Sequence, residues 1–213
     1  MKTTWLISLL IITCVALDAK KPMDLTKAKD HVKNYYASGQ FEKEVATIAK
    51  KAWKKFSKVP VQQNSVIVFD IDDTAISDYF ATMEYDFGNL LKIKPTAWAK
   101  EGNFPAIKPI KELYDKLVNR GFKIVFLSNR EQALFYPTKK NLIDQGYTTF
   151  ERVIVRPANG KKQGSAQFKE DIRTQLVNEG YTIAGCIGDQ ASDLAGKHTG
   201  IKIKLPNYVY NVA

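Results

Sequence analysis

Three short polar segments, each directly after an apolar run, hold the residues of this chain that suit phosphate chemistry. They read Asp-Ile-Asp-Asp-Thr at 70–74, Ser-Asn-Arg at 128–130 and Gly-Asp-Gln-Ala-Ser-Asp at 188–193. A carboxylate can attack phosphorus and form an aspartyl phosphate, which divides a slow hydrolysis into two easier steps. The spacing therefore predicts one phosphate-transfer site assembled from three parts of the chain.

Asp70 and Asp72 are the candidate catalytic pair. They lie two residues apart, so an extended backbone turns both side chains to the same side. Asp70 is suited to act as the nucleophile, and Asp72 to protonate the leaving oxygen and later take a proton from water. An aspartate-rich segment is also common in turns and helix caps, so this segment alone leaves both interpretations open.

Several carboxylates around a dianionic phosphate require a cation. Asp70 and Asp189 therefore predict a hard, oxygen-ligated metal, for which Mg2+ is the first choice. Asp193 would hold a metal-bound water or orient a lysine. Ser128 can donate its hydroxyl to a phosphate oxygen, and Lys169 offers a positive charge to the transferring group.

Each of these residues also has a purely structural interpretation. Ser128 and Ser192 could cap the helices that follow them. Lys169 lies on a predicted helix with other lysines nearby, and Thr74 would hydrogen-bond either its own loop or the nucleophile. The shared placement of the polar segments after strands favours a site over these alternatives.

The elements that must position these residues alternate between strands and helices. Apolar, β-branched runs predict strands at 66–69, 124–127, 153–155, 183–187 and 201–205. Helical patterns lie between them, at 107–119, 137–144, 168–178 and 192–197. This order predicts an α/β, Rossmann-like parallel sheet with helices on both faces. Ligands bind beyond the carboxyl ends of such strands, where the polar segments should converge.

Two further segments surround this alternating core. Residues 24–57 predict two polar helices, broken near Ser38 and Gly39, that pack against the domain. Residues 75–108 are longer than a strand-to-helix connection needs, which predicts a small inserted cap over the strand ends. Its aromatic rings would stack on a planar substrate group or form a core of their own. The candidate specificity residues are Tyr79, Tyr85 and Trp98 in the cap, and Arg130.

The composition fits an exported protein with one globular domain. The 213 residues are 45% apolar, which is enough for one core. Lys2, the apolar stretch 5–17 and Ala19 predict a signal peptide over residues 1–19, with a buried N-terminal element as the alternative. The stretch is too short to span a bilayer comfortably. We therefore expect a secreted or periplasmic domain at 20–213, with no stable membrane anchor after signal removal.

The net charge of +10 bears on the partners of the chain. It could attract phosphorylated substrates, anionic lipid or nucleic acid. A solvated, lysine-rich surface accounts for most of it more simply. We expect a small-molecule phosphomonoester as partner and no nucleic acid. The oligomeric state stays open, with a homodimer among the options.

Taken together, the polar segments resemble the four motifs of the haloacid dehalogenase superfamily. Residues 69–77, 128–130 and 188–194, with the pair Phe168 and Lys169, are similar to its subfamily IIIB of secreted acid phosphatases. That group includes bacterial class C acid phosphatases and plant vegetative storage proteins. The resemblance covers residues 65–213. It implies a Rossmann-like core with a cap, Mg2+, and hydrolysis of phosphomonoesters, including nucleoside monophosphates as candidates, through an aspartyl phosphate.

The resemblance also implies a role for each matching residue. Asp70 would be the nucleophile and Asp72 the general acid and base. Ser128, Asn129 and Lys169 would bind the phosphate. Asp70, the main-chain oxygen of Asp72 and Asp189 would ligate the metal. Thr74 and Asp193 would support these groups. The chain departs from the family pattern at four positions. It has Asp73 where Glu is common, Ala75 where a larger apolar residue is common, Asp78 where Asn is common and Ala191 where Trp is common. These departures bear on substrate preference.

Competing functions use the same sequence less well. His31 and His198 are the only histidines and neither lies in an Arg-His-Gly string, while Cys186 lacks the arginine loop of a cysteine phosphatase. A phosphomutase uses the same parts, but export would separate it from sugar-phosphate metabolism. An exported binding or storage protein with this fold and little turnover is the remaining alternative. The intact Asp70 and Asp72 argue against it.

Overall fold

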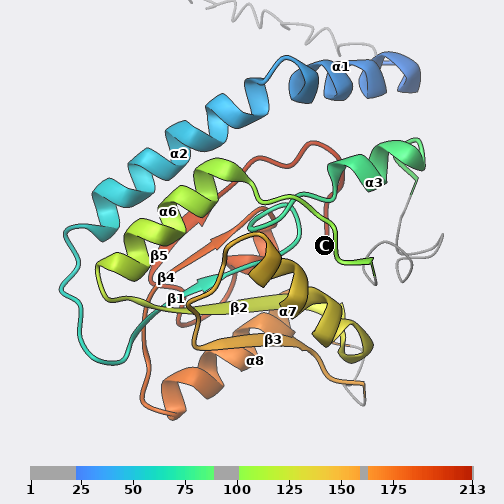
Figure 1. Ribbon diagram of the computed structural model, residues 1–213. Coiled ribbons are helices and arrows are strands. Elements are labelled where there is room, and N and C mark those ends of the chain that lie inside the picture. The colour runs from blue at the N-terminus through green and yellow to red at the C-terminus, as the bar shows by residue number, and fades with distance from the viewer. Residues whose placement is uncertain (1–22, 89–100, 159–162, 213) are drawn as a thin grey trace, which may run out of the picture.

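A computed structural model describes residues 23–88, 101–158 and 163–212. Within these ranges the chain forms a five-stranded parallel sheet of order β3-β2-β1-β4-β5 (Figure 1). The strands are β1 (Ser65–Phe69), β2 (Lys123–Glu131), β3 (Arg152–Arg156), β4 (Thr182–Gly188) and β5 (Ile201–Lys204). The predicted α/β parallel sheet is confirmed, and each strand lies within a few residues of its predicted position.

Two apolar clusters cover the two faces of this sheet. Along β1, Ile67 and Phe69 belong to one cluster and Val66 and Val68 to the other, because successive side chains of a strand point to opposite faces. The larger cluster includes residues of α2 (Gln40–Phe56), α6 (Lys108–Asn119) and α7 (Phe135–Asp144), and the smaller one residues of α8 (Ser165–Asn178). Burial on both faces explains why the strands are continuous apolar runs.

The predicted N-terminal helix pair is present. Helix α1 (Leu25–Ala37) has no buried residue, whereas α2 buries an apolar stripe at helical spacing. The stripe consists of Phe41, Val45, Ala49, Ala52 and Phe56. Gly39 separates the two helices with φ of 72°, in the left-handed region that glycine enters at little cost. The break near Ser38 and Gly39 is therefore confirmed, and α2 is the helix that fixes the pair to the sheet.

The predicted helix at 192–197 is wrong. Only one 3-10 turn forms there, η2 (Ala191–Asp193), and an irregular loop follows it. Gly196, His198 and Gly200 all have positive φ, between 55° and 76°, which a right-handed helix does not allow. The second polar segment also differs from expectation, because β2 continues past residue 127 to Glu131 through an irregular stretch, and 3-10 turn η1 (Gln132–Leu134) then leads into α7.

The predicted cap at 75–108 is described only in part. Its first part contains α3 (Tyr79–Glu84), and Ile76 bridges to Ala106 near its end. Residues 89–100, with the candidate Trp98, lie outside the described residues, as does the predicted signal peptide at 1–19. None of the helices that the structure describes is long and apolar enough to cross a membrane.

Close packing of α2 on the sheet predicts that Gly185→Ala destabilises the protein. A Cβ atom at Gly185 would lie 2.5 Å from Cε1 of Phe56 and 2.7 Å from the main-chain oxygen of Ile201. We expect a loss of about 1–3 kcal/mol in the free energy of unfolding, the usual cost of overpacking, measured by urea denaturation. Thr182→Ala, at an exposed position of the same strand, is the control and should change by less than about 0.5 kcal/mol. Equal stability of both variants would contradict this packing.

Candidate active site

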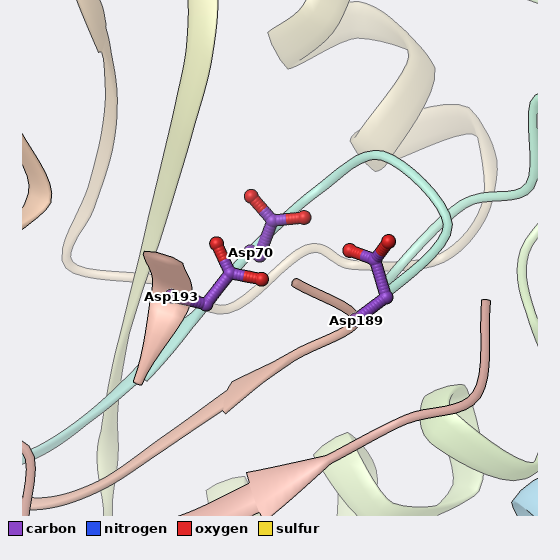
Figure 2. A group of neighbouring side chains, drawn as sticks. All are labelled: Asp70, Asp189 and Asp193. Atoms are coloured by element: carbon purple, nitrogen blue, oxygen red, sulfur yellow. The ribbon is translucent and has the colours of Figure 1, made fainter. Parts of the chain in front are cut away.

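The carboxyl ends of β1 and β4 bring three aspartates together. Asp70 directly follows β1 and Asp189 directly follows β4, while Asp193 lies on η2. The Asp70 main-chain N–H donates to the oxygen of Ile187 at 2.9 Å, which ties the two strand ends to each other. Carboxylate oxygens of Asp70, Asp189 and Asp193 lie within 4.8 Å of one another, and all three residues are buried (Figure 2). The predicted convergence is therefore confirmed.

Lys169 supplies positive charge to this cluster. It lies on α8, only 3% exposed, and its Nζ donates to Oδ1 of Asp70 and, at 2.5 Å, to Oδ1 of Asp193. Burial acts to lower the pKa of Lys169, but the charges of Asp70 and Asp193 outweigh it and hold the pKa above its usual range. Burial raises the pKa of Asp70 well above its usual range, the charge of Asp193 adds to this, and Lys169 opposes it. The lysine therefore stays charged beside the candidate nucleophile.

Asp72 has a different cation. Arg130 makes an ion pair with it, with Nη2 2.7 Å and Nε 3.0 Å from Oδ1 of Asp72, and Ser128 Oγ donates to Oδ2 at 3.1 Å. Arg130 also donates to Thr138 at 2.9 Å and lies over the ring of Phe104. Burial acts to raise the pKa of Asp72, but the charge and hydrogen bonds of Arg130 outweigh it, so the pKa lies below its usual range. Arg130, predicted as a specificity residue, thus contacts the candidate acid and base directly.

Asp189 is held on both of its carboxylate oxygens. Oδ1 accepts a hydrogen bond from the Thr74 hydroxyl at 3.2 Å, and Oδ2 accepts from Gln190 at 2.5 Å and Asn207 at 2.7 Å. Burial raises the pKa of Asp189 and the charge of Asp193 raises it further, while the Asn207 and Gln190 hydrogen bonds act against them. Carboxylate oxygens are the ligands that hard divalent cations prefer. The donor set of the three aspartates therefore fits such a cation.

A family model described as "HAD superfamily, subfamily IIIB (Acid phosphatase)" matches residues 13–213. The chain belongs to this family. The resemblance seen in the sequence is thereby confirmed.

Similar proteins include both enzymes and storage proteins. This chain is 27% identical to acid phosphatase 1 of Solanum lycopersicum over 188 residues, which is 86% of this chain and 74% of that protein. It is 32% identical to vegetative storage protein 1 of Arabidopsis thaliana over 190 residues, or 86% and 70% of the two chains. The crystal structure of the class C acid phosphatase from Bacillus anthracis with tungstate bound aligns with a TM-score of 0.72 and 20% identity, covering 88% of this chain and 86% of that one. That structural likeness supports the fold.

Both the oxygen and the nitrogen of the Asn129 amide have hydrogen-bond partners in the described residues. Its Oδ1 accepts from Arg156 at 2.6 Å, and its Nδ2 donates to Ser165 Oγ at 2.5 Å. Asn129 therefore links β2 to β3 and to the first residue of α8. Its predicted contact with phosphate stays a prediction.

Arg173 is a residue of the site region that no sequence motif predicted. It is fully buried on α8 and donates to the main-chain oxygens of Asp193, Ala195 and Lys197. These contacts hold the irregular loop that replaces the predicted helix at 192–197. A lone arginine on a polar helix gave no signal for this role, because its partners are carbonyl groups about twenty residues away in the sequence.

The described aromatic rings of the cap differ in how much of their surface is exposed. The ring of Tyr79 stacks on Tyr36 of α1, with centroids 3.8 Å apart and planes 9° from parallel, so one of its faces is covered. Tyr85 follows the end of α3 and is half-buried, whereas Phe80 on the same helix is 70% exposed. Of these rings, Phe80 offers the most free surface. No sequence pattern distinguishes Phe80 from the neighbouring aromatic residues.

The position of Lys169 between two carboxylates predicts that Lys169→Met destabilises the metal-free protein. The change leaves Asp70 and Asp193 buried without their cation, and breaking a buried pair in this way costs about 3–5 kcal/mol. Lys140→Met removes the same charge from an exposed pair with Asp144 and should cost less than about 1 kcal/mol. Urea denaturation in the presence of a chelator measures both. A similar loss in the two variants would show that Lys169 does not balance the cluster.

Proposed function

We propose that the chain is a phosphomonoesterase that uses Mg2+ and forms an aspartyl phosphate on Asp70. The observation that carries this proposal is the environment of Asp70. It is buried at the end of β1, contacts the charged Lys169, and lies within 4.8 Å of Asp189 and Asp193. Membership of an acid phosphatase subfamily supports phosphomonoester hydrolysis.

In this proposal Asp70, Asp189 and the main-chain oxygen of Asp72 hold the metal, with Asp193 in support. When bound, Mg2+ supplies positive charge to the phosphate oxygens and to the surrounding carboxylates. Lys169 adds a second positive charge from α8. The hydroxyl of Ser128, which donates to Asp72 in the substrate-free chain, would have to turn to donate to a phosphate oxygen. These groups offset the repulsion between a dianionic substrate and the aspartates.

The reaction then proceeds in two steps. A carboxylate oxygen of Asp70 bonds to phosphorus as the ester P–O bond breaks, and Asp72 gives its proton to the leaving alkoxide. Asp72, now ionised, takes a proton from water, whose oxygen bonds to phosphorus and releases phosphate and free Asp70. Arg130 and Ser128 hold Asp72 in place. Because Arg130 lowers the pKa of Asp72, it favours the ionised form that the second step needs and opposes the protonated form that the first step needs.

We further propose that phosphomonoesters with an aromatic group, nucleoside monophosphates among them, are preferred. The exposed ring of Phe80 supports this, since ring stacking adds to phosphate binding. Tyr85 and Trp98 stay candidates for the same role. Export after loss of residues 1–19 also belongs to the proposal and rests on the sequence.

A storage protein with little turnover is the second candidate, because vegetative storage protein 1 is among the similar proteins. Hydrolysis of p-nitrophenyl phosphate by the purified chain, measured with Mg2+ and with chelator, separates the two. Turnover that chelator abolishes and Mg2+ restores supports the phosphatase. No turnover under either condition supports storage.

The two-step mechanism predicts different losses for two isosteric variants. Asp70→Asn should abolish turnover, because an amide does not readily attack phosphorus. Asp72→Asn should slow alkyl phosphates by about a hundredfold to ten-thousandfold and nitrophenyl phosphate less, because nitrophenolate leaves without a proton. Asp115→Asn, an exposed carboxylate on α6, is the control and should keep full activity. Near-normal turnover by Asp70→Asn would rule out the covalent step on this residue.

The aromatic preference predicts a substrate-dependent effect of Phe80→Ala. We expect kcat/KM to fall about twofold to tenfold for adenosine monophosphate, the equivalent of one lost ring contact. For glycerol phosphate, which has no ring, kcat/KM should not change, so this substrate is the internal control. Tyr79→Ala tests the neighbouring ring in the same way. An equal fall for both substrates would argue against stacking.

A further inference from the structure

The chain returns to the candidate site after β5. Lys204 Nζ donates to the main-chain oxygen of Asp189, and the Leu205 N–H donates to the oxygen of Gly188 at 2.9 Å. The segment that follows, residues 207–212, lies at the carboxyl edge of the sheet, where the C-terminal end of the described chain is seen in Figure 1. We call residues 207–212 the C-terminal segment.

The C-terminal segment contacts the side chain of Asp189 through Asn207. The Asn207 Nδ2 donates to Oδ2 of Asp189 at 2.7 Å, and Gln190 Nε2 donates to the same oxygen at 2.5 Å. Two amide donors use both lone pairs of Oδ2. Among the described residues, Oδ1 receives one hydrogen bond, the longer one from Thr74 at 3.2 Å. Asp189 is therefore fixed through one oxygen and keeps acceptor capacity on the other.

The orientation of Asn207 is itself fixed. Its Oδ1 accepts the main-chain N–H groups of Val209 at 2.9 Å and Tyr210 at 3.2 Å. Because these N–H groups require the oxygen, the nitrogen of the same amide must face Asp189. The turn at 207–210 thus ensures that the nitrogen end of the Asn207 amide faces Asp189.

The second donor is held by the same segment. The Val212 N–H donates to Oε1 of Gln190 at 2.9 Å, which leaves the nitrogen of that amide for Asp189. Both side-chain amides on Oδ2 of Asp189 therefore have their oxygen end occupied by main-chain N–H groups of the C-terminal segment. This convergence on one carboxylate oxygen distinguishes the segment from a tail that merely packs on the surface.

We propose that Asn207 is a positioning residue for Asp189, and that the C-terminal segment orients this carboxylate toward the metal. The proposal rests on the metal site of the proposed function. Hydrogen bonds to a metal-ligating carboxylate fix its orientation, and losing one typically costs tenfold to a hundredfold in metal affinity. Asn207 itself does not touch the reacting atoms.

Calorimetric titration of the full chain with Mg2+ tests this. Asn207→Ala removes both the donor to Asp189 and the turn, whereas Asn207→Ser keeps a hydroxyl that can accept a turn N–H but is too short to reach Asp189. We expect both variants to raise the Kd for Mg2+ by about tenfold to a hundredfold. Asn64→Ala, which removes an exposed amide whose partner is the oxygen of Gly180, should leave the Kd unchanged.

Activity supplies a second measurement. The Mg2+ concentration needed for half-maximal hydrolysis should rise in both Asn207 variants by the same factor as the Kd. At saturating Mg2+, KM for p-nitrophenyl phosphate should equal that of the wild type. Thermal unfolding in chelator verifies that each variant is folded, and if Asn207→Ala is not, Asn207→Ser carries the test.

Three results would overturn the inference. A wild-type Kd in both Asn207 variants would show that Asp189 needs no support from Asn207, while leaving the proposed function intact. If Asn207→Ala raises the Kd for Mg2+ but Asn207→Ser does not, the turn is responsible and the hydrogen bond from Asn207 to Asp189 is not. A wild-type chain that neither binds Mg2+ nor hydrolyses p-nitrophenyl phosphate would overturn the proposed function, and the inference with it.

Discussion

The contact of Lys169 with Asp70 and Asp193 is the interaction on which the site depends. Three carboxylates buried this close together are unfavourable unless positive charge accompanies them. The ammonium reaches them because the preceding residue, Phe168, is buried in the apolar cluster between α8 and the sheet. The packing of one helix on one face of the sheet therefore sets the charge balance of the site.

Asp70 and Asp72, the candidate catalytic pair, experience opposite environments although they are two residues apart. Burial and the other aspartates raise the pKa of Asp70, while Arg130 and Ser128 lower that of Asp72. A nucleophile must be ionised and a general acid protonated, so without metal and substrate these directions oppose the proposed roles. The positive charge of a bound cation would lower the pKa of Asp70, and the negative charge of a bound phosphate would raise that of Asp72. The two directions differ because Arg130, at the irregular end of β2, outweighs burial at Asp72, whereas Lys169, on α8, offsets burial at Asp70 only in part.

Local patterns predicted the parts of this structure that depend on local chemistry. Continuous apolar runs gave the strands, Gly39 marked the break between α1 and α2, and the position of Asp70 and Asp189 after strands predicted their convergence. The sequence did not predict contacts between distant segments. Arg173 holds the 192–197 loop out of a helix, and Asn207 meets Asp189 from the C-terminal segment. Neither residue belongs to a periodic pattern or a motif, because both act through hydrogen bonds to partners distant in sequence.

The departures from the family pattern at Asp73 and Asp78 can be understood from the same charge balance. Both residues follow β1, and the Asp78 main-chain N–H donates to Oδ1 of Asp73 at 3.3 Å. Burial raises the pKa of Asp73 well above its usual range and the charge of Asp78 adds to this, while burial raises the pKa of Asp78 to about 6.

Two neighbouring carboxyls whose pKa values are both raised keep their protons to a higher pH than exposed aspartates do. A protonated carboxyl can donate a hydrogen bond, as the amide of Asn does. As the pH falls through about 6, protonation of Asp78 therefore removes negative charge from this pair. A buried acid pair repels a dianionic phosphate less in that protonated form.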